Sequence, residues 1–433
     1  MNLFFLSDKE KRFDFFMSLS IMISSYTFFN QPFEGYFHYL IFLLFLPYFF
    51  IRYGFTGFTF KLLILPVLFG IINLLLGNCE FFGFFKILFG FFLSVTFYNY
   101  LFIHYSFDYK KIFSLYLNGI VICAYIGFIE LISFRIGFTP GYNYSWLFNK
   151  WGLHPGSIFG LRLNSIFSEP SQFALMLLPA VFISVEHLIS RKYSILSFFN
   201  CIVVCLAMIF TTSSTGYIGV FFILVILAIN YERILYILYF SILGVLAYFA
   251  LYRWVDDFRV RVDTSVNLWT KEQFTIDDIN SSSFVLYNNV NVMKKSFSDN
   301  PFIGRGLGSY ELAYEKYSLT KEEDFLIKEG FDFNSKDGNS LLLRCVVELG
   351  LLGILFWLFF IPKYFVKKNN SINDLNNDDL TWVYNGAVLT ILLGYLLRQG
   401  NYFINGFPFF CLFYYYSCTN PNPINEIDDS DES

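Results

Sequence analysis

Residues 214–252 read STGYIGVFFILVILAIN, then YE, then RILYILYFSILGVLAYFALY, so two long apolar runs are separated by only two residues. A helix needs about 20 consecutive apolar residues to cross the hydrocarbon core of a bilayer, where backbone polar groups must be hydrogen-bonded internally. Each run therefore predicts a membrane-spanning helix. Over the whole chain of 433 residues, 56% are hydrophobic and 15% are charged. That is too little charge to cover a water-soluble particle of this size.

Apolar windows of this kind recur along the chain and predict an all-α polytopic membrane protein with about twelve spans. The predicted spans fall near residues 13–30, 36–52, 58–77, 81–104, 112–134, 170–189, 193–211, 214–230, 233–252, 339–362, 381–398 and 402–418. The expected division of the chain is nine spans in residues 1–252, a loop subdomain in 253–338, three spans in 339–418 and an acidic tail in 419–433.

The positions of lysine and arginine predict the orientation, because basic residues in short loops resist translocation. The N-terminus resembles a secretion signal but has no small-residue cleavage site, so we expect an uncleaved first span. An even number of spans then places both termini in the cytoplasm and the segments 135–169 and 253–338 outside. In this frame the inner loops hold Lys9, Lys11, Arg12, Arg52, Lys61, Lys110, Lys111, Arg191, Lys192, Arg233, Lys363, Lys367 and Lys368.

The outer loop 253–338 is expected to be partly helical. Its three serines at 281–283 are placed to cap a helix that ends near Ser298, and Ser309 to cap a second helix through Tyr317. Residues 300–308 contain Asn-Pro and three glycines, which predicts a break between the two helices.

Several polar residues lie where predicted spans meet the outer face. Arg162 precedes the sixth span, with Glu169 and Pro170 at the start of that helix. Helix capping explains Glu169 and Pro170, but it does not explain a cation just outside the bilayer. Ser213 lies in a hydroxyl-rich turn that is either a tight connection or a site for a sugar or phosphate oxygen.

The second half of the chain adds further candidates. Arg344 and Glu348 are four residues apart on one helix face, so they either neutralise each other or mark a functional site within the membrane. Asn339 begins the same span. Arg398 and Tyr402 lie in the short outer turn before the last span, where Arg398 breaks the positive-inside pattern.

Arginine side chains are a shared feature of these outer segments. Arg305 stands among glycines, where backbone amides can approach an anion, although a flexible turn is the alternative explanation. Arg162, Arg305, Arg344 and Arg398 can all reach one level near the outer leaflet. Because guanidinium groups bind phosphate oxygens in pairs, a diphosphate-bearing lipid is the expected ligand.

Four segments together resemble the O-antigen and capsule polysaccharide polymerases (Wzy type), which are relatives of the O-antigen ligases. The similar segments are RLNSIFSEPS at 162–171, SSTG at 213–216, NPFIGRGLGS at 300–309 and GNSLLLRCVVELGLLG at 338–353. Their order, the expected topology and the outer loop agree with this family from roughly residue 60 to residue 418.

The resemblance implies a multispan glycosyltransferase of the bacterial inner membrane, with a fold like that of the GT-C enzymes. Its substrate would be an undecaprenyl-diphosphate-linked oligosaccharide. The enzyme would join repeat units at the outer face of the cytoplasmic membrane. Arg162, Arg305 and Arg398, with Arg344, are then candidates for binding diphosphate, with Glu169 or Glu348 as the base. Asn339, Ser213 and Tyr402 complete the candidate substrate-binding residues. A chain-length regulator is a further expected partner.

Two alternatives remain open at this stage. The related ligases have a histidine before the asparagine at the start of the tenth span, where this chain has Gly338, and this difference favours a polymerase over a ligase. A lipid-linked oligosaccharide flippase would have short loops and charges at mid-membrane depth. Neither a nucleic-acid partner nor a cofactor or metal is indicated, and the seven cysteines are expected to be packing residues.

Overall fold

The computed structural model describes residues 9–23, 26–29, 34–156, 160–191, 195–254, 256–270, 280–322, 333–368 and 380–419. Most of the acidic tail (420–433), Lys192, and the loop residues 271–279 and 323–332 lie outside these ranges. In the described part, helices dominate, with two short antiparallel hairpins, which confirms the predominantly helical class. The hairpins pair β1 (Thr27–Phe29) with β2 (Gly35–Tyr36) and β3 (Pro155–Gly156) with β4 (Gly160–Leu161).

Each of the apolar windows contains helix. The corresponding helices are α1 (Lys9–Met22), α2 (Phe37–Tyr53), α3 (Phe58–Leu75), α4 (Phe81–His104), α5 (Tyr109–Arg135), α6 (Pro170–Ser190), α7 (Phe198–Phe210), α8 (Ser214–Asn230), α9 (Ile234–Trp254), α15 (Leu341–Leu349), α16 (Leu351–Lys363), α17 (Thr381–Arg398) and α18 (Phe407–Thr419). By length and composition, four helices among the described residues can cross a membrane: α3, α4, α5 and α6. Several apolar helices therefore indicate a membrane protein, while the number of spans stays a prediction.

Two windows differ from the single helices expected of them. The first window reaches residue 30, but α1 ends at Met22 and a short strand follows. Fourteen residues rise only about 21 Å along a helix axis, which is less than the thickness of a bilayer core. The tenth window is divided at Gly350 into α15 and α16.

The break at Gly350 is required by close backbone packing. Gly350 has φ of +61°, and a Cβ there would lie 2.6 Å from both the Gly304 nitrogen and the Pro301 oxygen. Gly304 has the same φ and an equally close contact with the Gly350 backbone. Only glycine fits at either position, because any larger side chain would separate the outer loop from the end of α15.

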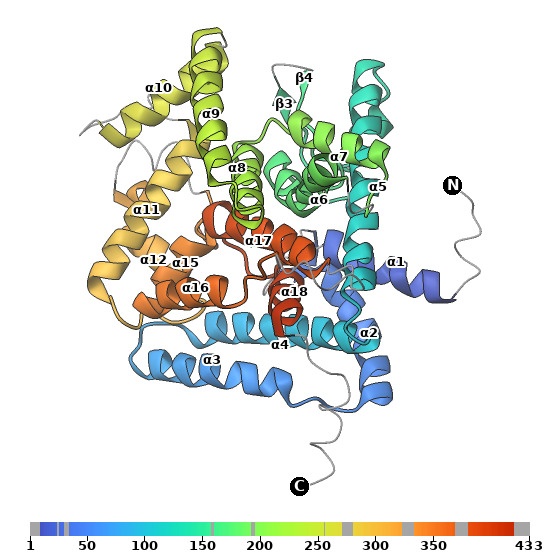
Figure 1. Ribbon diagram of the computed structural model, residues 1–433. Coiled ribbons are helices and arrows are strands. Elements are labelled where there is room, and N and C mark those ends of the chain that lie inside the picture. The colour runs from blue at the N-terminus through green and yellow to red at the C-terminus, as the bar shows by residue number, and fades with distance from the viewer. Residues whose placement is uncertain are drawn as a thin grey trace.

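The core is formed where α17 packs against α6, α8 and α18, near the middle of the molecule in Figure 1. Small residues allow this close approach: Gly394 of α17 receives Leu175, and Gly219 of α8 receives Leu178, both from α6. The helices do not form one parallel bundle. In Figure 1, α3 and α4 lie side by side and run across the direction of α5 and α9.

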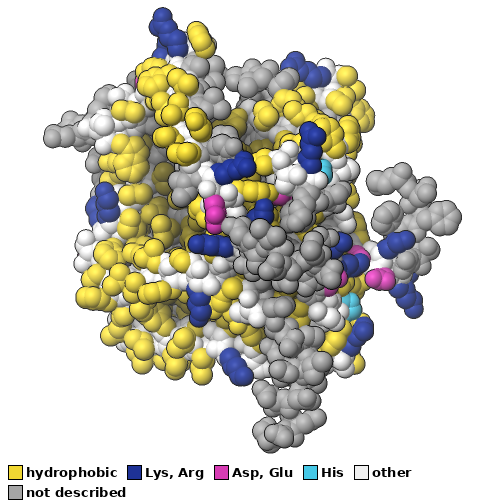
Figure 2. All heavy atoms as spheres, viewed as in Figure 1, with side chains coloured by type: hydrophobic (Ala, Val, Ile, Leu, Met, Phe, Trp, Pro, Cys, Tyr) yellow, Lys and Arg dark blue, Asp and Glu magenta, His cyan; other side chains and the backbone are white. Residues whose placement is uncertain are grey.

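Much of the exterior is apolar. Helix α3 exposes Phe60, Ile64, Leu65 and Leu68, each more than half accessible. Figure 2 shows hydrophobic side chains over α3 and over the region of α8 and α9, with lysine and arginine as separate small groups. Apolar areas of this extent on a single chain are typical of contact with lipid.

The predicted outer loop contains α10 (Asp256–Thr270), α11 (Ser281–Asp299), α12 (Tyr310–Tyr317) and α13 (Leu319–Glu322), and the 3₁₀ helix η2 (Thr139–Gly141) lies in the preceding segment 135–169. Both helices predicted in this loop are present, but their capping differs from the prediction. Asn280 caps α11 by accepting from the Ser282 amide. Ser309 occupies the N-cap position of α12 as predicted, but its hydroxyl donates to the Gly306 carbonyl at 2.6 Å and accepts no amide of the helix.

Polar contacts connect segments that the charge pattern assigns to the same side. On the predicted inner side, Lys111 forms an ion pair with Asp14 at 2.7 Å, and the Lys368 amide donates to Asn230 at 2.8 Å. On the predicted outer side, Lys150 forms an ion pair with Glu34 at 2.8 Å. These contacts join residues that are far apart in sequence, so they agree with the expected alternation of the chain between two faces.

Candidate functional site

A cavity of about 460 Å³ opens where six parts of the chain meet. Its lining comes from the segment 34–39, the first turns of α4, Lys150, the start of α6, residues 334–344 and the turn 401–404. Each of these is an end or loop that the distribution of basic residues places outside. The volume lies within the range of small-molecule sites.

The lining is rich in cations. Four of the lining residues are basic, namely Lys86, Lys150, Lys336 and Arg344, and two are acidic, namely Glu34 and Asp337. Lys150 forms an ion pair with Glu34. Lys86, on α4, makes no hydrogen bond or ion pair with any residue that the structure describes, although it lines the cavity. A lysine in this position is available to an anionic ligand.

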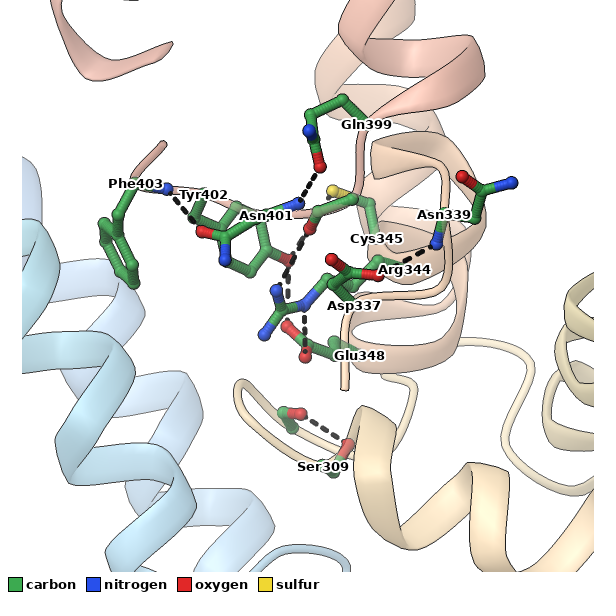
Figure 3. Close-up of polar contacts among 12 residues, drawn as sticks. Ser309, Asp337, Asn339, Arg344, Cys345, Glu348, Gln399, Asn401, Tyr402 and Phe403 are labelled. Carbon is green, nitrogen blue, oxygen red and sulfur yellow. Dashed lines mark hydrogen bonds and ion pairs between the residues drawn. The ribbon is translucent and has the colours of Figure 1, made fainter. Parts of the chain in front are cut away.

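Arg344 is held by three contacts, shown in Figure 3. Its Nε donates to Glu348 Oε1 at 2.9 Å, and its Nη1 donates to the Gly400 carbonyl at 3.0 Å. The guanidinium carbon lies 4.2 Å from the centre of the Tyr402 ring. Arg344 is 6% exposed and still lines the cavity. These contacts fix the plane of the guanidinium, and its Nη2 has no hydrogen bond with the described residues.

Glu348 is fully buried beneath Arg344 and does not line the cavity. Its second carboxylate oxygen accepts from the Tyr402 hydroxyl at 2.8 Å. Because Glu348 is buried away from the cavity lining, no route to a substrate hydroxyl is evident. This geometry favours a role for Glu348 in orienting Arg344 over the role of base.

Gly400 brings the last outer turn into the site. A Cβ at Gly400 would lie 1.6 Å from the Asp337 carbonyl oxygen, so the two backbones are in direct contact. This contact places Asn401 beside Arg344 at the cavity, as Figure 3 shows. Asn339, in contrast, directs its side chain away from Arg344 in Figure 3, and its amide donates to Asp337 at 3.2 Å.

The glycine-rich segment 300–308 serves to close the end of α15. The Arg305 and Gly306 amides donate to the Val347 and Glu348 carbonyls at 2.9 and 2.8 Å. Those amides are therefore occupied by the protein itself. The Arg305 guanidinium donates to Tyr317 at 2.7 Å, and the residue is not part of the cavity lining.

Arg162 and Ser213 lie together but at another place. Arg162 donates to the Thr212 hydroxyl at 3.1 Å and to the Thr212 carbonyl at 3.3 Å. Ser213 follows directly and is buried at the N-terminus of α8. Arg162 therefore holds the turn between α7 and α8, and neither residue lines the cavity.

Glu169 and Arg398 are both close in sequence to lining residues, but they differ in exposure and in hydrogen bonding. Glu169 is exposed and accepts from the Ser171 hydroxyl at 3.0 Å, while the neighbouring Ser168 and Gln172 line the cavity. Glu169 thus stands near its rim. Arg398, at the end of α17, is half-buried and has no hydrogen bond or ion pair with the described residues.

The four arginines expected to share one binding site do not all meet at this cavity. Of the four, Arg344 alone is a lining residue, and lysines supply the other positive charges. Sequence reasoning missed Lys86, Lys336 and Glu34. Lys86 carried a usable signal, because it is a lysine inside a predicted span, where ionisable residues are expensive and usually functional.

Glu34 is the better supported carboxylate at the cavity. Its side chain accepts from Lys150 at 2.8 Å and from the Tyr36 hydroxyl at 2.5 Å. Burial alone would raise the pKa of Glu34, but the hydrogen bonds from Lys150 and Tyr36 outweigh burial and lower it. Glu34 is consequently ionised at neutral pH.

Comparisons with protein-family models, curated proteins and solved structures return no match for this chain. The described residues contain no group of three or more His, Cys, Asp or Glu side chains placed to hold a metal ion. Assignment of function therefore depends on the residues and geometry given above.

Proposed function

We propose that this protein is a membrane glycosyltransferase that polymerises undecaprenyl-diphosphate-linked oligosaccharide repeat units into O-antigen or capsular polysaccharide. The observation that supports it most is the cavity at the predicted outer ends of the helices, where Lys86, Lys336 and Arg344 face a common space. The four segments similar to the polymerase family support the same function. The substrate is amphipathic, and the chain offers both an apolar exterior and a polar cavity.

Cations are the groups this reaction requires most. When the bond between the sugar and the diphosphate breaks, negative charge develops on the diphosphate oxygens. Fixed positive charges that face those oxygens lower the barrier, because they are already oriented before the reaction begins. Arg344 is the best placed of them, since Glu348, Gly400 and Tyr402 hold its guanidinium in one orientation.

Aromatic residues of α4 also line the cavity. Phe82, Phe85 and Phe89 project from α4 beside Lys86, and Phe85 stacks on Phe89 with ring centroids 6.1 Å apart. All three are exposed. An apolar surface next to a cation suits a ligand in which an isoprenoid chain continues directly from a diphosphate.

Deletion of the gene, followed by electrophoresis of the surface glycans, tests the proposal. A polymerase mutant shows a single repeat unit in place of a ladder of chain lengths. A ligase mutant retains polymer on the lipid carrier, and a flippase mutant accumulates the single unit on the inner membrane face; either result would overturn the proposal. Complementation with wild-type protein should restore the ladder.

A purified system tests the chemistry directly. Lipid-linked repeat units extracted from the deletion strain are incubated with the protein in detergent. Polymer and free undecaprenyl diphosphate should appear in a fixed ratio of one released carrier for each new linkage. Polymer formation only in the presence of added cytoplasmic extract would assign the transfer step to another enzyme.

A further inference from the structure

We infer that the side of the cavity around Glu34 binds the acceptor sugar, and that Glu34 receives the proton of the attacking hydroxyl. This inference rests on the proposed function and assigns a specific role within it. Neither Glu34 nor its neighbours belong to the segments that resemble the polymerase family. The argument comes from hydrogen-bond geometry, from the kinds of side chain present and from their position relative to the cations.

A connected polar network surrounds Glu34. Tyr36 donates to Glu34 Oε2, and Asn401 donates from Nδ2 to the Tyr36 hydroxyl at 2.9 Å. Asn401 is fixed in turn, because its Oδ1 accepts from the Phe403 amide at 2.9 Å. Glu34 is about one quarter exposed and lines the cavity, so its carboxylate is both oriented and reachable.

The lining residues near this network are of the types that commonly bind sugars in proteins. Sugar hydroxyls pair with carboxylate and amide groups, and the C–H faces of sugar rings pack on aromatic rings. Here Glu34 and Asn401 supply the planar polar groups, and Tyr36 and Tyr39 supply the rings. Gln172 lines the same cavity, and its buried Oε1 has no hydrogen-bond partner in the described part of the chain.

An unpaired buried carbonyl oxygen is unfavourable unless a ligand supplies a donor. A sugar hydroxyl is such a donor. Gln172 belongs to the first turn of α6, whereas Glu34 precedes β2, so separate segments converge on the same space.

The transfer step balances with these groups alone. The acceptor hydroxyl oxygen forms a bond to the anomeric carbon of the donor sugar, while the bond from that carbon to the diphosphate oxygen breaks. The diphosphate leaves with the bonding electrons and is stabilised by Lys86, Lys336 and Arg344. The hydroxyl proton passes to the Glu34 carboxylate and then to water, so no oxidant, reductant or further reactant is needed.

A carboxylate with a lowered pKa can perform this role. The attacking hydroxyl becomes acidic only as its oxygen bonds to the anomeric carbon, so a weak base that is fully ionised is sufficient. Lys150, Tyr36 and Lys86 are the titratable groups that shift the pKa of Glu34, and Tyr39 lies close enough to interact with its charge. Among these, Lys150 is the charged residue in direct contact.

Glu34→Gln in the full-length protein is the first test. We expect turnover of the extracted repeat unit to fall by about 100-fold or more, with the affinity for undecaprenyl diphosphate unchanged, because the cations are intact. Glu34→Asp should restore part of the rate, and the exposed Glu315 supplies the control variant Glu315→Gln. Turnover that stays near wild type in Glu34→Gln, or loss of undecaprenyl diphosphate binding, would overturn the assignment.

The pH profile provides a readout that a purely structural role would not change. Turnover should decline in acid as Glu34 becomes protonated. Lys150→Met removes the contact that lowers the pKa of Glu34, so the pKa rises and the decline should move to higher pH. An unmoved profile in Lys150→Met, or a complete loss of turnover in Glu169→Gln alone, would transfer the role of base away from Glu34.

Failure of this inference is distinguishable from failure of the proposed function. If wild-type protein forms no polymer from extracted repeat units, the proposed function fails. If wild-type protein forms polymer and Glu34→Gln does so equally well, only the role of Glu34 fails. A melting temperature for each variant in detergent separates both outcomes from misfolding.

Discussion

Arg344 Nε lies 2.9 Å from Glu348 Oε1, one helical turn further along α15, and both side chains are buried. The Tyr402 hydroxyl donates to the second oxygen of the same carboxylate. A buried ion pair of this kind contributes little net stability, since desolvation offsets the attraction. The pair instead fixes the orientation of one guanidinium at the wall of the cavity.

Arg344→Lys should weaken binding of undecaprenyl diphosphate. Lysine keeps the charge but cannot contact Glu348, Gly400 and a phosphate oxygen at the same time. Loss of one charge-assisted hydrogen bond corresponds to about a tenfold or larger increase in Kd, measurable by titration in detergent. The matched control is Arg52→Lys on α2 at the predicted inner side, and equal affinity of the two variants would contradict the assignment.

Glu348→Gln should destabilise the protein more than it alters the chemistry. Removal of one partner from a buried ion pair leaves a buried uncompensated charge and costs about 3 kcal/mol or more. We therefore expect a lower melting temperature in detergent. Turnover should fall only to the extent that the Arg344 guanidinium is no longer held in one orientation. A variant that melts like wild type but has no turnover would instead identify Glu348 as the base.

Lys86→Met should reduce affinity for the diphosphate and make the remaining binding less sensitive to salt. Lys86 has no ion pair or hydrogen bond with the described residues, so Lys86→Met breaks no polar contact within that part of the chain. Screening weakens interactions between separated charges as ionic strength rises. Kd measured between low and high salt, with Lys61→Met on α3 as the control, tests this expectation. The same salt dependence in Lys86→Met and wild type would exclude contact between Lys86 and the ligand.

Arg398→Ala and Arg162→Ala should both abolish long-chain glycan while the protein stays inserted and abundant. The two variants test different causes of that loss. Arg398 does not line the cavity and has no hydrogen bond or ion pair with the described residues, so loss of polymer in Arg398→Ala would indicate a ligand contact beside the cavity. Arg162 holds the turn at Thr212, so Arg162→Ala also disturbs the backbone. Polymer of normal length in Arg398→Ala would exclude a ligand contact by Arg398, and in Arg162→Ala it would show that the turn at Thr212 tolerates the loss of these hydrogen bonds.

The sequence alone predicted the helical class and the positions of the helices, because apolar windows are a local property of the chain. Within residues 253–338 it also predicted α11, α12 and the break between them, but not α10 or α13. It placed Arg344, Glu348 and Tyr402 among the candidates, since ionisable residues within apolar segments stand out from their surroundings.

Tertiary structure alone decided which of those candidates share a cavity. Gly304 against Gly350, and Gly400 against Asp337, are backbone contacts between distant segments, and nothing in the local sequence of either partner specifies the other. Arg162 and Arg305 were expected at the ligand, but Thr212 and Tyr317 accept their hydrogen bonds. Glu34 and Gln172 were overlooked because only packing brings them to one cavity, whereas Lys86 was overlooked although a lysine inside a predicted span is a local signal.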